Sequence, residues 1–410
     1  MELTSATLPG IALTLIHTGR AATRSALTSQ LGVTRATTGA IAGELRDLGL
    51  IEVDPGPGSG SPGSGSPGGG QQGRPSHRLL PDPSGPVALA AQVHSDGFAV
   101  ALVGLGGTVV ARRAENGPVP ADPGQALAPV ATAAAALLAG SGRRCVGAAV
   151  AVPTAVTRPE GTAVRALYVG WPDGAPVRDI FAAELGRLGV RGPRGGPAGC
   201  YAVNDVNALA LAEHRHGAGR DATHLLVVSA EQRGVGGALV QRGALYTGSG
   251  GLAMEAGHVS VDPGGRLCLC GNRGCLSVEA DVERFLGEAG RPASAGTPVL
   301  DEAVAVLRAG YPADKRVRAA ADMVAVRLGL GLAGLINVVN PDRVLLGGLY
   351  RELLEVAPER LREAVTRRSP WGHGAGIPIE RCELDDAGLI GAAEVAWQPV
   401  LDNPALLRGE

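Results

Sequence analysis

A short segment past the middle of the chain holds side chains that can bind a metal ion. His258 is followed after nine residues by Cys268-Leu-Cys270-Gly-Asn-Arg-Gly-Cys275. One imidazole and three thiolates form a closed tetrahedral site, the coordination typical of structural Zn²⁺. The glycines permit the tight turns that such close ligand spacing requires. The alternative is a group of free buried cysteines, but four suitable ligands within 18 residues favour one metal site.

A second set of polar side chains can hold a ligand by hydrogen bonds. Asn204 and Asp205 lie in Val-Asn-Asp-Val-Asn-Ala, and Glu255 begins the segment Glu-Ala-Gly-His that ends at His258. Carboxylates and amides can bind neighbouring hydroxyl groups in pairs, and a metal-bound histidine keeps a second ring nitrogen for another partner. An isolated Asn-Asp pair is more often a turn or a helix cap. From the residues alone, both interpretations of Asn204 and Asp205 stay open.

Together with Pro-Asp-Arg-Val-Leu-Leu-Gly-Gly at 341–348, these motifs resemble the ROK family of repressors, open reading frames and kinases. The family hallmark is ExGH followed by CxCGxxGC, and the resemblance covers essentially the whole chain. It favours the transcriptional-regulator branch that includes xylose- and N-acetylglucosamine-type repressors. It implies a two-lobed, actin-like ATPase fold and places Asp205 at the family's catalytic-base position. It also implies a set of sugar contacts: Asn204, Asp205, Glu255 and His258.

Two segments that hold nucleotide phosphates in kinases of this family are altered. Where those kinases have DxGxT, the chain reads Gln-Val-His-Ser-Asp at 92–96, and where they have GTGxG it reads Gln-Arg-Gly-Val-Gly at 232–236. Phosphoryl transfer depends on positioning and charge stabilisation of the phosphates. We therefore expect no ATP as cofactor and no catalysis by Asp205. An ATP-dependent sugar kinase is the alternative.

Two further positions differ from the kinases around the sugar. Ser277 stands where they have a glutamate, and Tyr168 stands where an asparagine commonly contacts the ligand. Losing two polar contacts costs about a few kcal/mol of binding unless other groups replace them. The effector is accordingly expected to be a sugar, a sugar phosphate or another derivative, and a regulator without an effector is a further alternative.

The N-terminal residues predict a winged helix-turn-helix. Ser25 is expected to cap a first helix, Gly32 to supply the turn and Thr34 to cap a second helix. Apolar residues at helical spacing predict the buried faces: Leu27 and Leu31 in the first helix, and Ile41, Leu45 and Leu48 in the second. The segments 49–53 and 73–80 read as the two strands of a wing. A helical hairpin with a solvated polar face is the alternative.

The start of the second helix carries small and hydroxyl-bearing side chains that would let it approach the major groove closely. The predicted DNA contacts are Thr34, Arg35, Thr37, Thr38 and Arg74. Residues 55–73, which contain only Gly, Pro, Ser and Gln, are expected to be a disordered insertion in the wing. An ordinary linker between domains is the alternative for these residues.

After Pro86, strand-like and helical segments alternate, which predicts an α/β domain. The expected strands are 87–105, 146–152, 224–228 and 343–346, and the expected helices are 121–138 and 319–339. The predicted domains are residues 1–82, the winged helix-turn-helix, and residues 85–410, the ROK-type sensing domain.

Charge and composition limit the function classes. The 410 residues include 37 Lys or Arg and 39 Asp or Glu, a formal net charge of −2, so the chain is not a polycation and any DNA contact must be local. Cys145, Cys200 and Cys382 are scattered, which suits a reducing compartment. We expect no membrane contact, because no run of about 18 uncharged apolar residues is apparent, and hence a cytoplasmic protein.

These observations predict a homodimeric or tetrameric transcriptional regulator, a repressor by type, with operator DNA and a sugar-like effector as partners and Zn²⁺ as a structural cofactor. The competing classes are the sugar kinase and a non-catalytic scaffold with an incidental helix-turn-helix.

Overall fold

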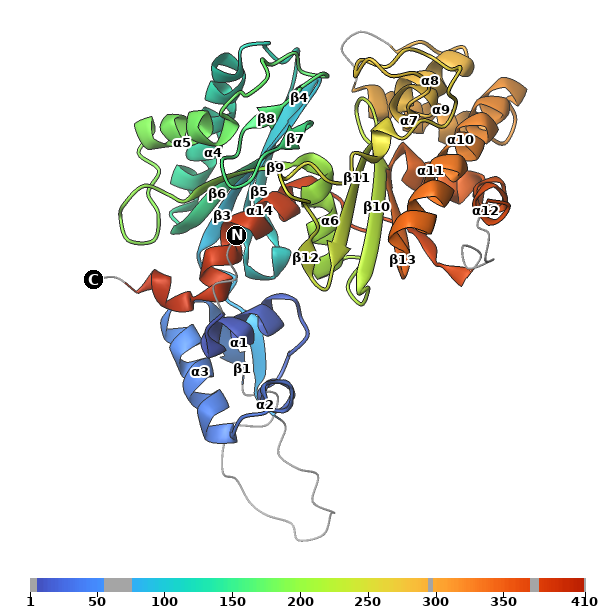
Figure 1. Cartoon of the computed structure of the whole chain (residues 1–410). Coiled ribbons are helices and arrows are strands. Elements are labelled where there is room, and N and C mark those ends of the chain that lie inside the picture. The colour runs from blue at the N-terminus through green and yellow to red at the C-terminus, as the bar shows by residue number, and fades with distance from the viewer. Residues whose placement is uncertain (1–5, 55–75, 294–297, 369–375, 409–410) are drawn as a thin grey trace, which may run out of the picture.

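The computed structural model describes residues 6–54, 76–293, 298–368 and 376–408. A small N-terminal module lies below two larger lobes in Figure 1. Arg74 and the predicted wing insertion, residues 55–73, lie outside the described residues.

The module contains three helices and a two-stranded antiparallel wing. Its elements are α1 (Leu8–His17), α2 (Arg24–Leu31), α3 (Arg35–Asp47), β1 (Ile51–Asp54) and β2 (Arg78–Pro81). Gly32 ends α2 in the left-handed conformation with φ 64°. Thr34 caps α3, since its hydroxyl accepts a hydrogen bond from the Thr37 N–H at 3.2 Å. The predicted helix-turn-helix and wing strands are therefore present.

Two details of the predicted module are wrong. Thr23, and not Ser25, caps α2 by accepting a hydrogen bond from the Ala26 N–H. Thr38 is only 1% exposed, because its hydroxyl accepts a hydrogen bond from Thr28 and donates one to the Thr34 carbonyl, so it faces α2 and the core. Thr38 is therefore placed to join the two helices, and the exposed start of α3 does not include it.

Lobe I is built on a five-stranded sheet in the order β5-β4-β3-β6-β9. The predicted run 87–105 forms two strands of a hairpin, because the chain reverses at residues 95–96. The strands are β3 (Val87–His94), β4 (Gly97–Gly104), β5 (Val109–Asn116), β6 (Cys145–Val152) and β9 (Cys200–Asn204). The helices of this lobe are α4 (Pro123–Ser141) and α5 (Val177–Arg187), and a small hairpin is formed by β7 (Ala155–Val156) and β8 (Ala163–Val164).

Lobe II has a second five-stranded sheet in the order β12-β11-β10-β13-β14. Its strands are β10 (His224–Ala230), β11 (Gly236–Gln241), β12 (Ala244–Leu245), β13 (Arg343–Gly348) and β14 (Ile379–Arg381). Its helices are α7 (Leu276–Glu279), α8 (Val282–Glu288), α9 (Val299–Gly310), α10 (Lys315–Val339), α11 (Leu349–Val356) and α12 (Pro358–Thr366). Short 3₁₀ turns are η1 (Leu105–Gly107), η2 (Ala256–His258) and η3 (Pro404–Leu407).

Two helices, α6 (Asp205–His216) and α14 (Ala387–Asp402), lie side by side between the lobes (Figure 1). Gly391 of α14 allows their backbones to touch, since a Cβ at this position would lie 1.7 Å from the carbonyl oxygen of Ala208 in α6. The N-terminal module is not separate from these elements. Leu13 and Ile16 of α1 belong to one hydrophobic core with Trp397 of α14 and residues of the lobe I sheet.

The expectation that no segment could span a membrane needs correction. Pro123–Ser141 and Lys315–Val339 are long and apolar enough to do so by length and composition alone. In the structure they are α4 and α10, which bury apolar side chains in the cores of the two lobes, for example Leu127 and Val130 in lobe I and Leu328 and Leu332 in lobe II. Core helices of globular proteins meet the same criterion.

The contact between α6 and α14 predicts a strong cost for one added methyl group. Gly391→Ala should lower the unfolding free energy by about 1 to 3 kcal/mol, because the helices must separate to admit the side chain. Gly334→Ala in α10 is the matched control, since no atom lies within 4 Å of the added Cβ, and it should stabilise the protein by about 0.5 to 1 kcal/mol. Denaturant unfolding of both variants measures the difference. Equal stability of the two variants would contradict the close helix contact.

Candidate ligand pocket and metal centre

A cavity of about 350 Å³ lies where the two lobes face each other. Lobe I lines it with residues from the β7–β8 region and from the end of β9, and lobe II with the loop after β10 and the segment before η2. The carboxyl ends of strands are the usual position of ligands in α/β folds. All four predicted sugar-contacting side chains line this cavity: Asn204, Asp205, Glu255 and His258.

Asn204 combines the two interpretations that the sequence left open. It is the N-cap of α6, because its Oδ1 accepts a hydrogen bond from the Asn207 N–H at 3.0 Å. Its Nδ2 donates to the Thr154 carbonyl and to Asp205 Oδ1, both at 3.1 Å, so both amide protons are used. The remaining acceptor lone pair is what Asn204 can offer to a ligand. Its main effect is to orient Asp205.

Asp205 begins α6 and is 8% exposed. Its Oδ1 accepts hydrogen bonds from Asn204 and from the Val206 N–H at 2.8 Å, which leaves Oδ2 for a ligand hydroxyl. Burial raises the pKa of Asp205 to about 7, and the nearby carboxylates of Glu231 and Glu255 add to the rise. The group can therefore change protonation near neutral pH.

Glu231 is a pocket residue that sequence analysis missed. It directly follows β10, lines the cavity, and its carboxylate accepts a hydrogen bond from Ser229. Burial raises the pKa of this carboxyl group above its ordinary value. Its position at the carboxyl end of a buried strand, directly before 232–236, was the available signal. Arg165 and Arg233 also line the cavity and supply two cations, and Arg233 pairs with Glu283 at 3.4 Å.

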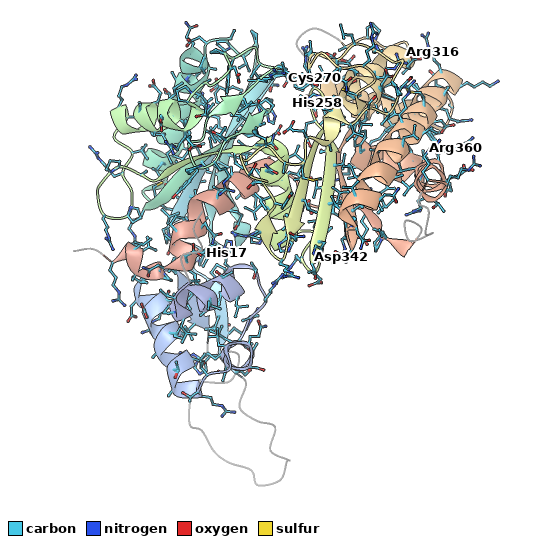
Figure 2. The ribbon with its side chains drawn as sticks, in the orientation of Figure 1. His17, His258, Cys270, Arg316, Asp342 and Arg360 are labelled. Carbon is cyan, nitrogen blue, oxygen red and sulfur yellow. The ribbon has the colours of Figure 1, made fainter. Side chains whose placement is uncertain are left out.

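The four predicted metal ligands converge beside this cavity. Their ligand atoms all lie within 4.8 Å of one another. Cys268 Sγ is 3.8 Å from His258 Nδ1, and Cys270 Sγ is 3.7 Å from Cys275 Sγ. A tetrahedron with metal–sulfur bonds of about 2.3 Å has edges of about 3.8 Å, so the donor set fits a tetrahedral metal ion. Figure 2 shows His258 and Cys270 close together near the upper end of β11.

The candidate DNA-binding surface is the start of α3 in the module. Arg35 is exposed, Thr34 is exposed while its hydroxyl caps the helix, and Thr37 is half-buried with its hydroxyl 2.9 Å from that of Thr34. Arg20 lies between α1 and α2. It does not join this surface, since it donates a hydrogen bond to the carbonyl of Arg220, just after α6, at 2.7 Å.

Comparison with known proteins decides the family. The model of the ROK family matches residues 91–398 of the chain. The chain belongs to the ROK family. A solved ROK family transcriptional regulator, described as a homologue of the Escherichia coli MLC protein, superposes on 97% of this chain and 96% of its own chain, with a TM-score of 0.72 and 21% sequence identity. This likeness shows the fold, and it confirms the predicted actin-like architecture with an N-terminal winged helix-turn-helix.

Among curated ROK relatives are both kinases and regulators. A glucokinase from Thermotoga maritima is 34% identical over 206 residues, which cover 48% of this chain and 65% of that protein. The regulator NagC from Escherichia coli is 28% identical over 209 residues, which cover 50% of this chain and 51% of NagC. The chain thus spans between half and two thirds of the length of these relatives.

Side chains of this ROK chain contact both altered phosphate segments. Tyr168 lies against the loop 232–236, and a Cβ at Gly234 would be 2.4 Å from the Tyr168 hydroxyl oxygen. Ser277 is buried and its hydroxyl bonds to both the N–H and the carbonyl of Val235, so it holds the loop and does not line the cavity. At the first segment, Gln92 packs against Gly388 of α14.

The raised pKa of Asp205 predicts a pH-dependent stability. In the unfolded chain the carboxyl group ionises near pH 4, about three units below its folded pKa of about 7, so the folded state binds more protons between these values. Stability from this group is present below about pH 4 and is lost as pH rises to about 7. Asp205→Asn keeps an Oδ1 acceptor and cannot ionise, so it does not lose this stability as pH rises.

The melting temperature of Asp205→Asn minus that of the wild type should therefore increase between pH 5 and pH 8. Scanning calorimetry across this range measures it. A difference that stays constant with pH would show that Asp205 ionises in the folded protein as it does in the unfolded chain.

Proposed function

We propose that this protein is a sequence-specific DNA-binding transcriptional regulator, a repressor by type, that responds to a sugar or sugar derivative bound between its lobes. The supporting observation is the combination of a polar pocket with altered phosphate segments. Asn204, Asp205 and Glu255 line the cavity, while Tyr168 lies against the loop at Gly234. A sugar sensor needs the polar pocket and does not need intact nucleotide phosphate loops.

The relatives support the regulator. NagC is named a DNA-binding transcriptional dual regulator, and the solved structure that covers 97% of this chain is that of a transcriptional regulator. The effector that we propose is carbohydrate-like. The cations of Arg165 and Arg233 suit a sugar that carries an anionic group as well as a neutral one.

For DNA binding we propose Arg35 with Thr34 and Thr37 as groove or phosphate contacts of α3. Arg74 remains a proposed contact from the wing. A dimer or tetramer would present pairs of recognition helices to half-sites about 34 Å apart, and such pairing offsets the low net charge of the chain. The protein is proposed to act in the cytoplasm.

A sugar kinase is the second candidate function, because a glucokinase is among the relatives. Glu231 and Tyr168 argue against it. A buried carboxylate and a phenol ring at the loop where the family kinases hold phosphates would repel or displace a nucleotide's phosphates. Incubation with ATP, Mg²⁺ and glucose should give no sugar phosphate above background, and steady turnover would favour the kinase.

We further propose that the metal is one structural Zn²⁺ per chain on His258, Cys268, Cys270 and Cys275. The His258 to Cys275 segment has little core of its own, since Leu267 and Leu269 are 64% and 63% exposed. A metal ion would supply the cross-link that this segment lacks.

Elemental analysis of protein purified without chelator should find about one zinc per chain. Cys270→Ser should lose zinc and lower the melting temperature, because one of four donors is gone. Cys145→Ser, which changes a buried cysteine outside the cluster, is the control and should keep zinc. Zinc-free wild-type protein of unchanged stability would refute the structural role.

The regulator predicts a DNA affinity that a carbohydrate changes. A genomic binding footprint supplies the operator, and titrations of that DNA with D-glucose, D-xylose, N-acetyl-D-glucosamine and their phosphates test the effector. An effective sugar should shift the affinity by about 5- to 150-fold, which corresponds to about 1 to 3 kcal/mol of coupling. Asp205→Ala should abolish the shift and leave ligand-free DNA binding intact, whereas Arg35→Ala should weaken DNA binding itself.

The two variants separate the two halves of the proposal. Full sugar response in Asp205→Ala would exclude this pocket as the sensor. Unchanged operator affinity in Arg35→Ala would remove that side chain from the DNA interface. Absence of any footprint would contradict the proposed regulator function and favour the sugar kinase or the non-catalytic scaffold.

A further inference from the structure

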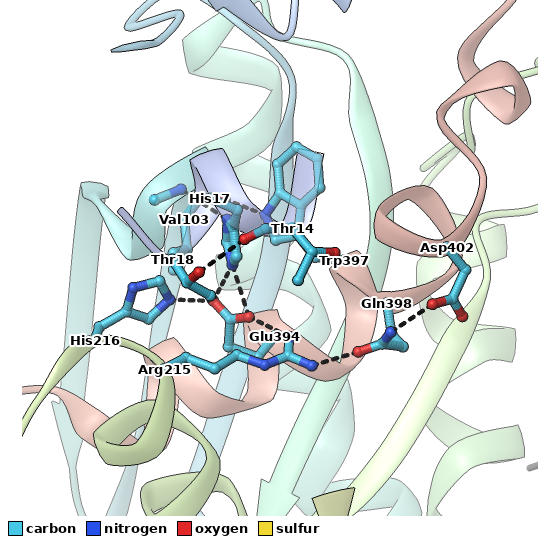
Figure 3. A network of polar contacts seen from close by, with 11 residues as sticks. Thr14, His17, Thr18, Val103, Arg215, His216, Glu394, Trp397, Gln398 and Asp402 are labelled. Carbon is cyan, nitrogen blue, oxygen red and sulfur yellow. Dashed lines mark hydrogen bonds and ion pairs between the residues drawn. The ribbon is translucent and has the colours of Figure 1, made fainter. Parts of the chain in front are cut away.

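A buried carboxylate joins the N-terminal module to the two helices between the lobes. Glu394 of α14 is fully buried and contacts three side chains from two other segments (Figure 3). His17, the last residue of α1, lies with its Nε2 2.8 Å from Glu394 Oε2, and His216 Nε2 is 2.8 Å from Oε1. Arg215 pairs with the same carboxylate. Arg215 and His216 are the last residues of α6.

The hydrogen bonds define the protonation of this group. The Gly106 N–H donates to His17 Nδ1 at 2.8 Å, so the His17 proton is on Nε2 and is donated to Glu394. Burial lowers the pKa of His17, which agrees with a neutral ring. Burial opposes ionisation of Glu394, but His17 and Arg215 hold its pKa well below the usual value. Arg215, on α6, supplies a permanent positive charge to Glu394.

The spacing favours a hydrogen-bonded joint over a second metal site. His17, His216 and Glu394 are ligand types, but their N···O distances of 2.8 Å are ordinary hydrogen bonds. Nitrogen and oxygen donors about 2.1 Å from one tetrahedral ion would lie about 3.4 Å apart. The guanidinium of Arg215 on the carboxylate also disfavours a cation.

The other end of α1 is fixed to the same assembly. Thr7, the N-cap of α1, donates hydrogen bonds from its N–H at 2.9 Å and its hydroxyl at 3.1 Å to the Asp402 carbonyl of α14. Arg215 also donates to Gln398, whose amide donates to Asp402 Oδ1 at 2.8 Å. Arg220, just after α6, donates to the Thr18 carbonyl at 2.6 Å. Both ends of α1 thus depend on α14 and on the C-terminal end of α6.

α6 connects this joint to the ligand pocket. Its twelve residues span about 18 Å, from Asn204 and Asp205 at the cavity to Arg215 and His216 at Glu394. A helix transmits displacement along its axis because its backbone hydrogen bonds resist compression. The backbone contact at Gly391 makes α14 the surface against which such a displacement occurs.

We propose that α6 couples the pocket to the DNA-binding module, with Glu394 as the joint that senses its position. This inference rests on the proposed sensor function. A ligand that draws the two lobes together around Asp205 moves α6 along α14 and withdraws Arg215 and His216 from Glu394. A buried carboxylate that loses its cation is strongly disfavoured. The α1 helix, bound to it through His17, is displaced, and the recognition helix that packs on α1 changes orientation.

The first test needs no ligand and uses hydrogen exchange of the full-length chain, with amides of α10 as an internal reference. Glu394→Gln removes the charge and keeps the shape, and it should increase exchange in α1 by at least tenfold. His216→Gln, at a partly exposed position, is a milder variant if Glu394→Gln folds poorly. Arg408→Gln is the matched control, because it breaks an exposed link between Arg408 and Glu44 of the module and should leave α1 unchanged.

A separate variant tests whether α6 transmits a change at the pocket to α1. Asn204→Ala removes the cap and the Thr154 hydrogen bond at the pocket end, and it should increase exchange in α1 through α6 alone. Increased exchange in Asn204→Ala supports the coupling. Unchanged α1 exchange in either Glu394→Gln or Asn204→Ala, with α10 as in the wild type, would overturn it.

The second test measures the coupling with D-glucose, D-xylose and N-acetyl-D-glucosamine as probes. In Glu394→Gln the probe that shifts wild-type DNA affinity should bind with a dissociation constant within about threefold of the wild type, while the shift falls toward onefold. A full shift in Glu394→Gln would refute the joint. If no probe shifts the wild type, the proposed effectors fail, and the exchange experiment still decides the coupling. If the wild-type protein binds a second metal ion per chain and Glu394→Gln loses it, the cluster at Glu394 is a metal site and not a hydrogen-bonded joint.

Discussion

A buried carboxylate needs partners that offset its lost hydration. At Glu394 this requirement joins α14 to α1 and to the end of α6. Its partners come from α1 and from the end of α6, while the residue itself lies on α14. Three segments that are remote in sequence must therefore be present at once for the charge to be tolerated. The apolar surfaces of α1, α14 and the lobe I sheet form one core around this point. The N-terminal module consequently shares a hydrophobic core with α14 and lobe I, and is not an appendage on a linker.

The pocket shows a related balance of charge. Asp205 and Glu231 are carboxylates that line one cavity, and Glu231 disfavours ionisation of Asp205. Tyr168 lies against the loop at Gly234, and Gln92 packs on Gly388, so both altered phosphate segments contact side chains of the chain itself. The cavity therefore offers a bound ligand both carboxylates and, from Arg165 and Arg233, cations.

Much of the site was predictable because its information is local. The proposed metal ligands lie within one short segment, and their order and spacing alone predict a tetrahedral donor set. The turn at Gly32 and the cap at Thr34 are also local, since each is defined by hydrogen bonds within a few residues. Asn204 shows the limit of this approach. Its type and context indicated either a cap or a ligand contact, and only the structure shows that the cap and the bonds to Thr154 and Asp205 together use most of its hydrogen-bonding capacity.

The sequence by itself determined the family motifs, the alternation of strands and helices, and four of the polar residues at the pocket, Asn204, Asp205, Glu255 and His258, because these depend on residue type and short spacing. Tertiary structure decided which of these groups are buried and what they touch. Thr38 faces α2 because the two helices pack, Glu231 enters the cavity because β10 ends there, and 377 positions separate His17 from Glu394. Such contacts arise from the packing of the whole chain, in which every distant element contributes, and no local pattern of residues encodes them.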